Sequence, residues 1–186
     1  KFLKFIIILS FLITILITES NVYRPDAGLY HLPFIGILNS EKIIIGLSNL
    51  HFRFGHTSII QYLSAISNNL IFNNNGLVYS QAILAGAVMI NFVDQIYKYN
   101  KNKIYNFHFF YLLFVFIYIF YKMNRYSEYG NDAPAHFLVF FLISEIILFK
   151  DKIKQSEFIN HLTLTLFIIQ SKSMLIVAVL LNLINL

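Results

Sequence analysis

Several residue types are absent or scarce in this chain of 186 residues, and each absence narrows what the chain can do. Cysteine is absent, which excludes disulfides, zinc–thiolate centres and thiol catalysis. Charged residues make up only 12% of the chain, whereas hydrophobic residues make up 58% and the mean hydropathy is positive. Ordinary soluble domains carry about 25% charged residues, so this balance predicts a multi-pass membrane protein.

The motifs of several common enzyme classes are also missing. No Walker loop, GxGxxG, HExxH or GxSxG occurs anywhere in the chain. Tryptophan is absent, while phenylalanine contributes 20 residues and tyrosine 12. This skew, with abundant Ile, Asn and Lys, is typical of an AT-rich genome. The aromatic residues therefore do not indicate sugar or nucleic-acid binding, and we expect no nucleic-acid partner.

Long apolar runs are what the chain does contain. The candidate spans are about 2–18, 76–97, 105–123, 134–149 and 158–186, the last broken by SKS near residue 172. A helix needs about 20 mainly apolar residues to cross the hydrocarbon core, so the shorter runs must borrow from their flanks. The first run could instead be a signal peptide, but TESNVY lacks a small-x-small cleavage pattern. We expect an all-α, polytopic transmembrane helix bundle, with residues 1–186 as a single integral-membrane domain and a fragment of a longer chain.

Residues 57–72, TSIIQYLSAISNNLIF, decide the topology. On a helical wheel one face is apolar and the other polar. The apolar face holds Ile59, Leu63, Ile66 and Leu70, flanked by Ile60 and Ile71, and the polar face holds Ser58, Gln61, Ser64 and Asn68. This pattern favours a helix that lies flat in the membrane interface over one that crosses it.

The lysines test that choice, because cytoplasmic loops collect Lys and Arg. If 57–72 crossed, the basic loops 97–103 and 150–154 would both fall outside. If it lies flat, the following lysines are all inside: Lys1, Lys4, Lys98, Lys101, Lys103, Lys150, Lys152 and Lys154. The flat arrangement predicts a cytoplasmic N-terminus and two outer loops, about 19–75 and 124–134. It places all three arginines, Arg24, Arg53 and Arg125, in or beside these outer loops.

The first outer loop opens with YRPDAGLYHLP, residues 23–33, which carries Arg24, Asp26, Tyr30 and His31. A carboxylate at the membrane surface can act as a general base, and an adjacent guanidinium can hold a phosphate. The alternative is that Asp26 caps the following helix and that Arg24 lies at the level of the lipid headgroups. Asn39 or Ser40 is expected to cap a second helix, so the loop is predicted to form two or three short helices on the membrane.

A second polar segment is NLHFRFGHTS, residues 49–58, with His51, Arg53 and His56. These side chains could bind a phosphate or a lipid headgroup, or they could only pack the loop. A metal site that combines two of these histidines with His31 lacks the i, i+4 spacing and a neighbouring carboxylate, and we predict none.

The third polar segment is NRYSEYGNDAPAH, residues 124–136, with Arg125, Glu128, Asp132 and His136. Acidic residues at the mouth of a bundle can bind a cation or hold an acceptor sugar. Asp132 also fits a helix cap before Ala133 and Pro134.

The YRPDAGLYHLP segment and this topology resemble the N-terminal part of the GT-C superfamily of membrane glycosyltransferases, which place an Asp just after the first helix. The resemblance implies that Asp26 is the catalytic base, that Arg24 and Arg53 contact phosphate, and that Glu128 or Asp132 is the acid of the second loop. The remaining candidates would bind substrate: Tyr30, His31, His51, His56, Arg125 and His136. In its DxGLYHxP and NLHxRFG-like segments the chain is also similar to an uncharacterised family of multi-pass bacterial membrane proteins.

The GT-C resemblance implies an inverting glycosyltransferase at the outer face of a bacterial inner membrane, acting in cell-envelope glycan or lipid glycosylation. Its partners would be membrane lipid and a polyprenyl-phosphate sugar donor. No cofactor is firmly implied, although a divalent cation is compatible with the acidic residues. The alternative is a non-enzymatic, transport or polymerase-like membrane protein. A transporter would carry functional charges near the bilayer centre, whereas here they cluster in the outer loops.

Overall fold

The computed structural model describes residues 4–5, 7–8, 11–12, 15, 25–41, 44–71, 76–126, 129–149 and 153–183. Within these ranges the chain is helical or in turns and contains no strand, which confirms the expected all-α class. Arg24, Glu128 and most of the expected first span 2–18 lie outside the described residues.

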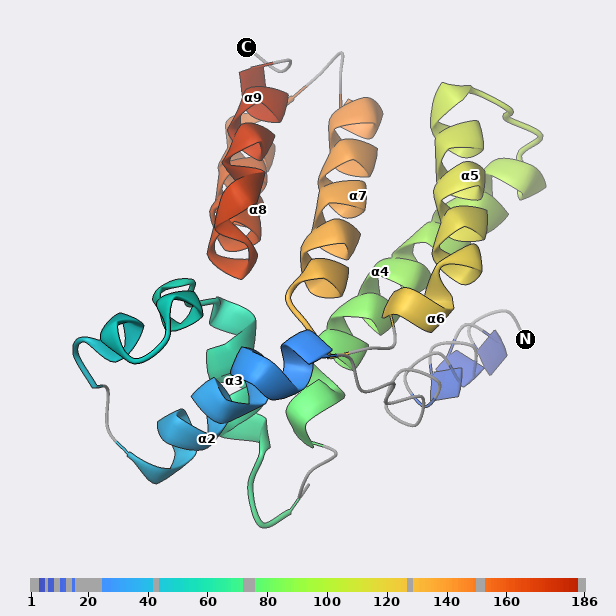
Figure 1. Ribbon diagram of the computed structural model, residues 1–186. Helices are drawn as coiled ribbons and strands as arrows, with labels where there is room; N and C mark the ends of the chain where they lie inside the picture. Colours follow the sequence, from blue (N-terminus) through green and yellow to red (C-terminus); the bar gives the residue numbers. More distant parts are fainter. Residues whose placement is uncertain are drawn as a thin grey trace.

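Four longer helices among the described residues form a bundle in which successive helices run in opposite directions (Figure 1). They are α4 (Gly76–Lys101), α5 (Phe107–Tyr121), α7 (Asp132–Phe149) and α8 (Gln155–Ser171), with the short α6 (Met123–Tyr126) between α5 and α7. The side chain of Asn106 caps α5 by accepting a hydrogen bond from the Phe109 amide at 2.9 Å.

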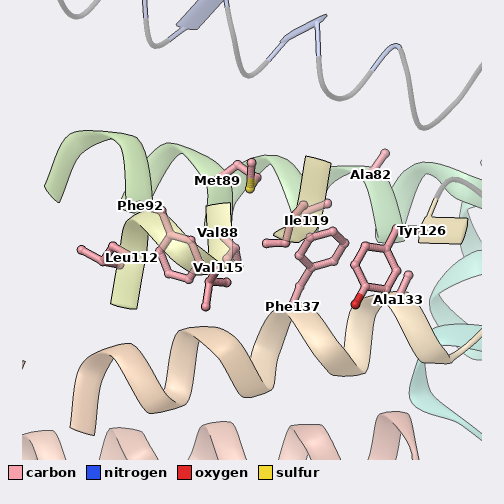
Figure 2. Packing of buried hydrophobic residues seen from close by; sticks show 11 residues of the cluster. Ala82, Val88, Met89, Phe92, Leu112, Val115, Ile119, Tyr126, Ala133 and Phe137 are labelled. Carbon is pink, nitrogen blue, oxygen red and sulfur yellow. The ribbon is translucent and has the colours of Figure 1, made fainter. Parts of the chain in front are cut away.

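Apolar side chains from α4, α5 and α7 interlock in the centre of the bundle (Figure 2). Met89, Phe92, Leu112, Ile119 and Phe137 are all fully buried there. Small residues at 82 and 85 of α4 keep the neighbouring helices close. Since interiors pack as densely as organic crystals, this contact fixes the relative placement of the three helices.

A buried polar link joins the same three helices. His108 of α5 lies with its Nε2 2.8 Å from Ser144 Oγ on α7 and its Nδ1 2.9 Å from Tyr99 Oη on α4. Ser144 and His108 are almost completely buried, so each depends on the other for its hydrogen bond.

The chain reverses direction at Lys172, whose extended backbone (φ −152°, ψ 104°) ends α8. The following η5 (Ser173–Ala178) and α9 (Val179–Asn182) pack back along α8 (Figure 1). Asn182 Nδ2 donates to Thr165 Oγ1 at 2.8 Å and holds the two segments together. The break expected in the last span 158–186 is therefore a hairpin of two antiparallel segments.

Two of the described helices, α4 and α7, are long and apolar enough to cross a membrane. α5 and the stretch Ser173–Asn182 are apolar but shorter. Several large apolar side chains of the bundle face outward, among them Phe110 (57% exposed) and Phe114 (70%) on α5 and Leu166 (61%) on α8.

Short helices cover one end of the bundle, where α4 and α7 begin and α5 and α8 end; we call it the loop end (Figure 1). They are η1 (Ala27–His31), α2 (Leu32–Ser40), η2 (Leu47–Asn49), η3 (Phe52–Gly55) and α3 (Ile59–Ser67). The opposite end, the lysine end, carries the last turn of α4 and the start of α8. The cap expected at Asn39 or Ser40 is wrong, because Ser40 is the last residue of α2 and its hydroxyl bonds Gly36 O at 3.0 Å.

Candidate functional site

A π turn in front of a proline forms the first part of the site. Residues 27–31 make this wider turn, and the Leu32 amide donates to Ala27 O. Pro33 has no amide hydrogen, and its ring would crowd the carbonyl four residues earlier in a regular helix. A π turn relieves that crowding. The helix therefore continues through Pro33 into α2 instead of stopping there.

Asp26 stands immediately before this π turn, and its carboxylate does not cap the helix, since the side chain makes no capping hydrogen bond. The capping alternative for Asp26 is therefore wrong. Among the described residues Asp26 forms no ion pair, whereas Asp132 forms two. Asp26 is exposed and lines two adjoining cavities at the loop end.

The two cavities have volumes of about 320 Å³ and about 100 Å³, and we call them the polar cavity and the small cavity. Five residues line both: Asp26, Tyr30, His31, Asn131 and Asp132. The polar cavity is also lined by Arg53, His56, Ser58 and Lys172. The small cavity adds Arg125, Tyr126 and Tyr129. Residues from both predicted outer loops thus meet around one space.

Arg53 and Tyr30 form one wall of the polar cavity. The Arg53 guanidinium carbon lies 4.8 Å from the centre of the Tyr30 ring, a cation–π contact. Burial raises the pKa of the Tyr30 hydroxyl, and the nearby Asp26 carboxylate raises it further, although a hydrogen bond with Arg53 acts in the opposite direction. The hydroxyl therefore stays protonated at neutral pH and can donate a hydrogen bond.

Asp132, the first residue of α7, is held between two cations. Lys172 Nζ lies 2.6 Å from Asp132 Oδ1, and Arg125 Nη2 lies 3.6 Å from Oδ2. The described lining of the two cavities then has three cations, Arg53, Arg125 and Lys172, against two carboxylates. This excess of positive charge suits a bound anion.

His31 is buried and lines both cavities. Its Nδ1 lies 2.9 Å from Gln61 Nε2, and Gln61 Oε1 accepts the Ser58 amide at 3.0 Å. Because an amide nitrogen can only donate, His31 Nδ1 accepts, and the ring proton is on Nε2. Burial lowers the pKa of His31 to about 4, so the ring is neutral at pH 7.

The polar face of α3 points into the protein. Ser58 Oγ donates to Ser171 O at 2.8 Å, and Ser64 Oγ donates to Leu77 O at 2.7 Å. On the opposite side Ile66 is 73% exposed, and Leu70, just beyond the helix, is 98% exposed. The two faces expected from the sequence are present, except that Ile60, which was expected to flank the apolar face, is completely buried. With nine residues the helix is about 14 Å long, too short to cross a bilayer.

The other predicted residues are more dispersed. His56 lines the polar cavity. His51 instead caps η3, where its Nδ1 accepts the Arg53 amide at 3.3 Å and its ring stacks on Phe52. His136 lies further along α7, with its Nδ1 3.3 Å from Tyr126 Oη. It therefore contacts Tyr126, which lines the small cavity, but His136 itself lines neither cavity.

Lys172 is the main residue of the site that sequence reasoning missed. In the sequence the SKS tripeptide, residues 171–173, indicated only a break in an apolar run. In the structure all three residues line the polar cavity. In the part of the chain that is described, no group of three or more His, Asp or Glu side chains could hold a metal ion.

The fold and site together define an all-helical protein with two helices able to cross a membrane and a cation-rich cavity at one end of its bundle. The chain belongs to the family described as a domain of unknown function (DUF8201), which it matches over residues 1–186. No curated protein and no solved structure matches it.

Proposed function

We propose that the protein is an integral membrane glycosyltransferase of GT-C type. In this proposal it works at the outer face of a bacterial inner membrane and takes a sugar from a polyprenyl-phosphate donor. The product would be a cell-envelope glycan or a glycosylated lipid. The observation that carries the proposal is Asp26, a carboxylate without an ion pair among the described residues, in a cavity with Arg53 and Lys172.

The distribution of polar and apolar groups supports a membrane location. α3 buries Gln61 and Ser64 together with Ile60, while it exposes Ile66 (73%), and burying polar side chains beside an exposed isoleucine is the reverse of what water would favour. The outward apolar side chains of α5 and α8 extend the same pattern over the bundle. Such surfaces suit contact with lipid.

The arrangement of charge supports the proposed orientation. Lys98 and Lys101 lie in the last turn of α4 and Lys154 precedes α8, all at the lysine end. The polar cavity lies at the loop end, with the described arginines Arg53 and Arg125. Cytoplasmic loops collect Lys and Arg, and the short loops 97–103 and 150–154 carry six lysines between them, so in this proposal the lysine end lies inside and the cavity faces outward.

The chemistry follows from the groups around the polar cavity. Asp26 takes the proton of the acceptor hydroxyl as its oxygen attacks the anomeric carbon from the side opposite the phosphate. The anomeric carbon–oxygen bond to phosphate breaks, and the polyprenyl phosphate leaves with its electron pair. Arg53 and Lys172 stabilise the negative charge of that leaving phosphate. Asp26 then releases its proton to water, and the configuration at the sugar is inverted.

Asp26→Asn tests this assignment. The amide keeps the shape of the carboxylate but cannot accept a proton, so transfer from a radiolabelled polyprenyl-phosphate sugar should fall by about 100-fold or more. Expression and the elution profile in detergent should not change. Glu41→Gln is the matched control, because Glu41 is an exposed acid that follows α2 on the same loop. Equal transfer by Asp26→Asn and the unaltered protein would remove Asp26 from the mechanism.

A further inference from the structure

A third cavity lies within the loop end and is lined mainly by apolar side chains; we call it the apolar cavity. Its volume is about 190 Å³, and it is enclosed by α2, η2, η3 and the start of α3. The side chains that form its walls include Phe34, Ile37, Leu38, Leu47, Phe54 and Tyr62. Phe34 contacts both Phe54 and Tyr62, with ring centroids 5.9 and 6.2 Å apart.

The apolar cavity and the polar cavity share one wall, the segment 53–58. Arg53, His56 and Ser58 line the polar cavity, whereas Phe54 and Gly55 line the apolar one. Thr57 lines both. A ligand that reached across this segment would therefore meet cations at one end and aromatic and aliphatic side chains at the other.

The size of the apolar cavity limits what it can hold. An apolar cavity of about 150 Å³ holds a benzene-sized molecule. Pockets that bury a whole drug-sized ligand are larger, about 300–1,000 Å³. The apolar cavity therefore fits a short hydrocarbon segment, such as the part of a lipid chain nearest its headgroup.

The surroundings of this cavity suit an amphiphile that enters from a membrane. Ile44, which lines the cavity, is 44% exposed, and its neighbour Ile45 is 97% exposed. Leu50, between η2 and η3, is 78% exposed, and Phe52, the first residue of η3, is 68% exposed. A hydrocarbon without a headgroup would make no use of the cations in the adjoining polar cavity. A lipid phosphate would place its chain in the apolar cavity and its phosphate beside those cations.

We propose that the apolar cavity binds the hydrocarbon segment next to the phosphate of a polyprenyl phosphate, while the phosphate itself lies in the polar cavity beside Arg53 and Lys172. The inference rests on the proposed function for the identity of the lipid. It adds the site that recognises the lipid chain, formed by α2 and η3, which the sugar-transfer step itself does not require.

Photo-crosslinking tests the location without any need for turnover. The probe is farnesyl phosphate with a diazirine in the isoprene unit next to the phosphate, added to the purified protein in detergent and irradiated. Mass spectrometry of the digested protein should find the crosslink in residues 34–38 or 47–55. Crosslinks confined to the outward faces of α5, α8 or α9 would overturn the proposal, because those faces contact any lipid.

A substitution that fills the cavity gives a second readout. A Cβ on Gly55 would lie 3.5 Å from Ser48 Cβ, an ordinary contact, so Gly55→Ile places its additional atoms beside the cavity wall. We expect farnesyl phosphate to bind about tenfold more weakly, which corresponds to about 1.4 kcal/mol. Binding of inorganic phosphate should not change. Gly36→Ile is the matched control, because a Cβ on Gly36 meets no atom within 4 Å.

The variants and the crosslinking experiment together distinguish failure of this inference from failure of the proposed function. Arg53→Ala should weaken farnesyl phosphate and inorganic phosphate alike, whereas Gly55→Ile should affect only the lipid. A crosslink in residues 34–38 or 47–55 without any sugar transfer would support the lipid site and count against the transferase. Sugar transfer together with equal lipid binding by Gly55→Ile and Gly36→Ile would retain the transferase and refute the apolar cavity as the lipid site.

Discussion

Replacing His31 by glutamine should make the protein less sensitive to acid. The His31 ring is neutral in the folded protein, where burial lowers its pKa to about 4, against 6.5 for an unperturbed histidine. Burial is the largest effect and Arg53 acts in the same direction, and together they outweigh Asp26 and Asp132, which favour protonation. As pH falls below 6.5, the unfolded chain takes up a proton that the folded chain does not. The free energy of unfolding therefore decreases, and it goes on decreasing until the folded protein also binds the proton near pH 4.

The size of this loss follows from the two pKa values. At roughly 1.4 kcal/mol per pH unit, and because the folded ring is itself half protonated at its own pKa of about 4, the loss between pH 7 and pH 4 is about 3 kcal/mol. For a chain of this length, 1 kcal/mol shifts the melting temperature by about 2–4 °C, so His31 accounts for a fall of about 6–12 °C between pH 7 and pH 4. Glutamine keeps an acceptor for Gln61 Nε2 but does not titrate. The melting temperature of His31→Gln should therefore fall less between pH 7 and pH 4 than that of the unaltered protein, by the amount attributed to His31.

The measurement is thermal unfolding in detergent, followed by circular dichroism at several pH values between 7 and 4. Every other ionisable group is the same in both proteins, so its effect cancels in the difference between the unaltered protein and His31→Gln. If the melting temperature falls by the same amount in both proteins between pH 7 and pH 4, burial does not hold His31 neutral.

Two further predictions concern the bundle and its orientation. Ser144→Ala leaves the buried His108 Nε2 without its partner at 2.8 Å, so the protein should lose about 1–3 kcal/mol of unfolding free energy in detergent, and unchanged stability would refute the link between α5 and α7. Since the chain has no cysteine, single cysteines at Asn74, Asn102 and Ser127 report topology directly. An impermeant thiol reagent added outside intact cells should label positions 74 and 127 but not 102, and labelling at 102 would reverse the orientation.

The two faces of α3 illustrate what a sequence alone can predict about this fold. Residues that repeat every three or four positions separate Ser58, Gln61 and Ser64 from Ile66 and its neighbours without any tertiary information. The periodicity does not say which face turns inward, because that depends on whether the surroundings are water or lipid. The structure resolves this point, since the three polar side chains are buried and bonded.

The residues of the site were predictable where they depend on which loops come together, and unpredictable where they depend on how the chain turns. Asp26, Arg53 and Asp132 were expected on one face because the lysine pattern places both loops there, and they line one cavity. Lys172 was missed because a polar break in an apolar run does not reveal whether the chain bends or reverses. The helical course through Pro33 also depends on a local detail, the wider π turn in front of it.

The hydrogen bond from Ser58 to the carbonyl of Ser171 has a consequence for the order in which the protein is made. It joins residues 113 positions apart, and the adjacent Lys172 is the last cation to reach the polar cavity. At roughly 5–20 residues per second, a ribosome needs about 6–23 s to synthesise the intervening chain. During that interval the nascent loop end carries Asp26 and Arg53 but has no Lys172. A chain stopped before residue 172 therefore contains most of the described helices but lacks the cation that completes the cavity.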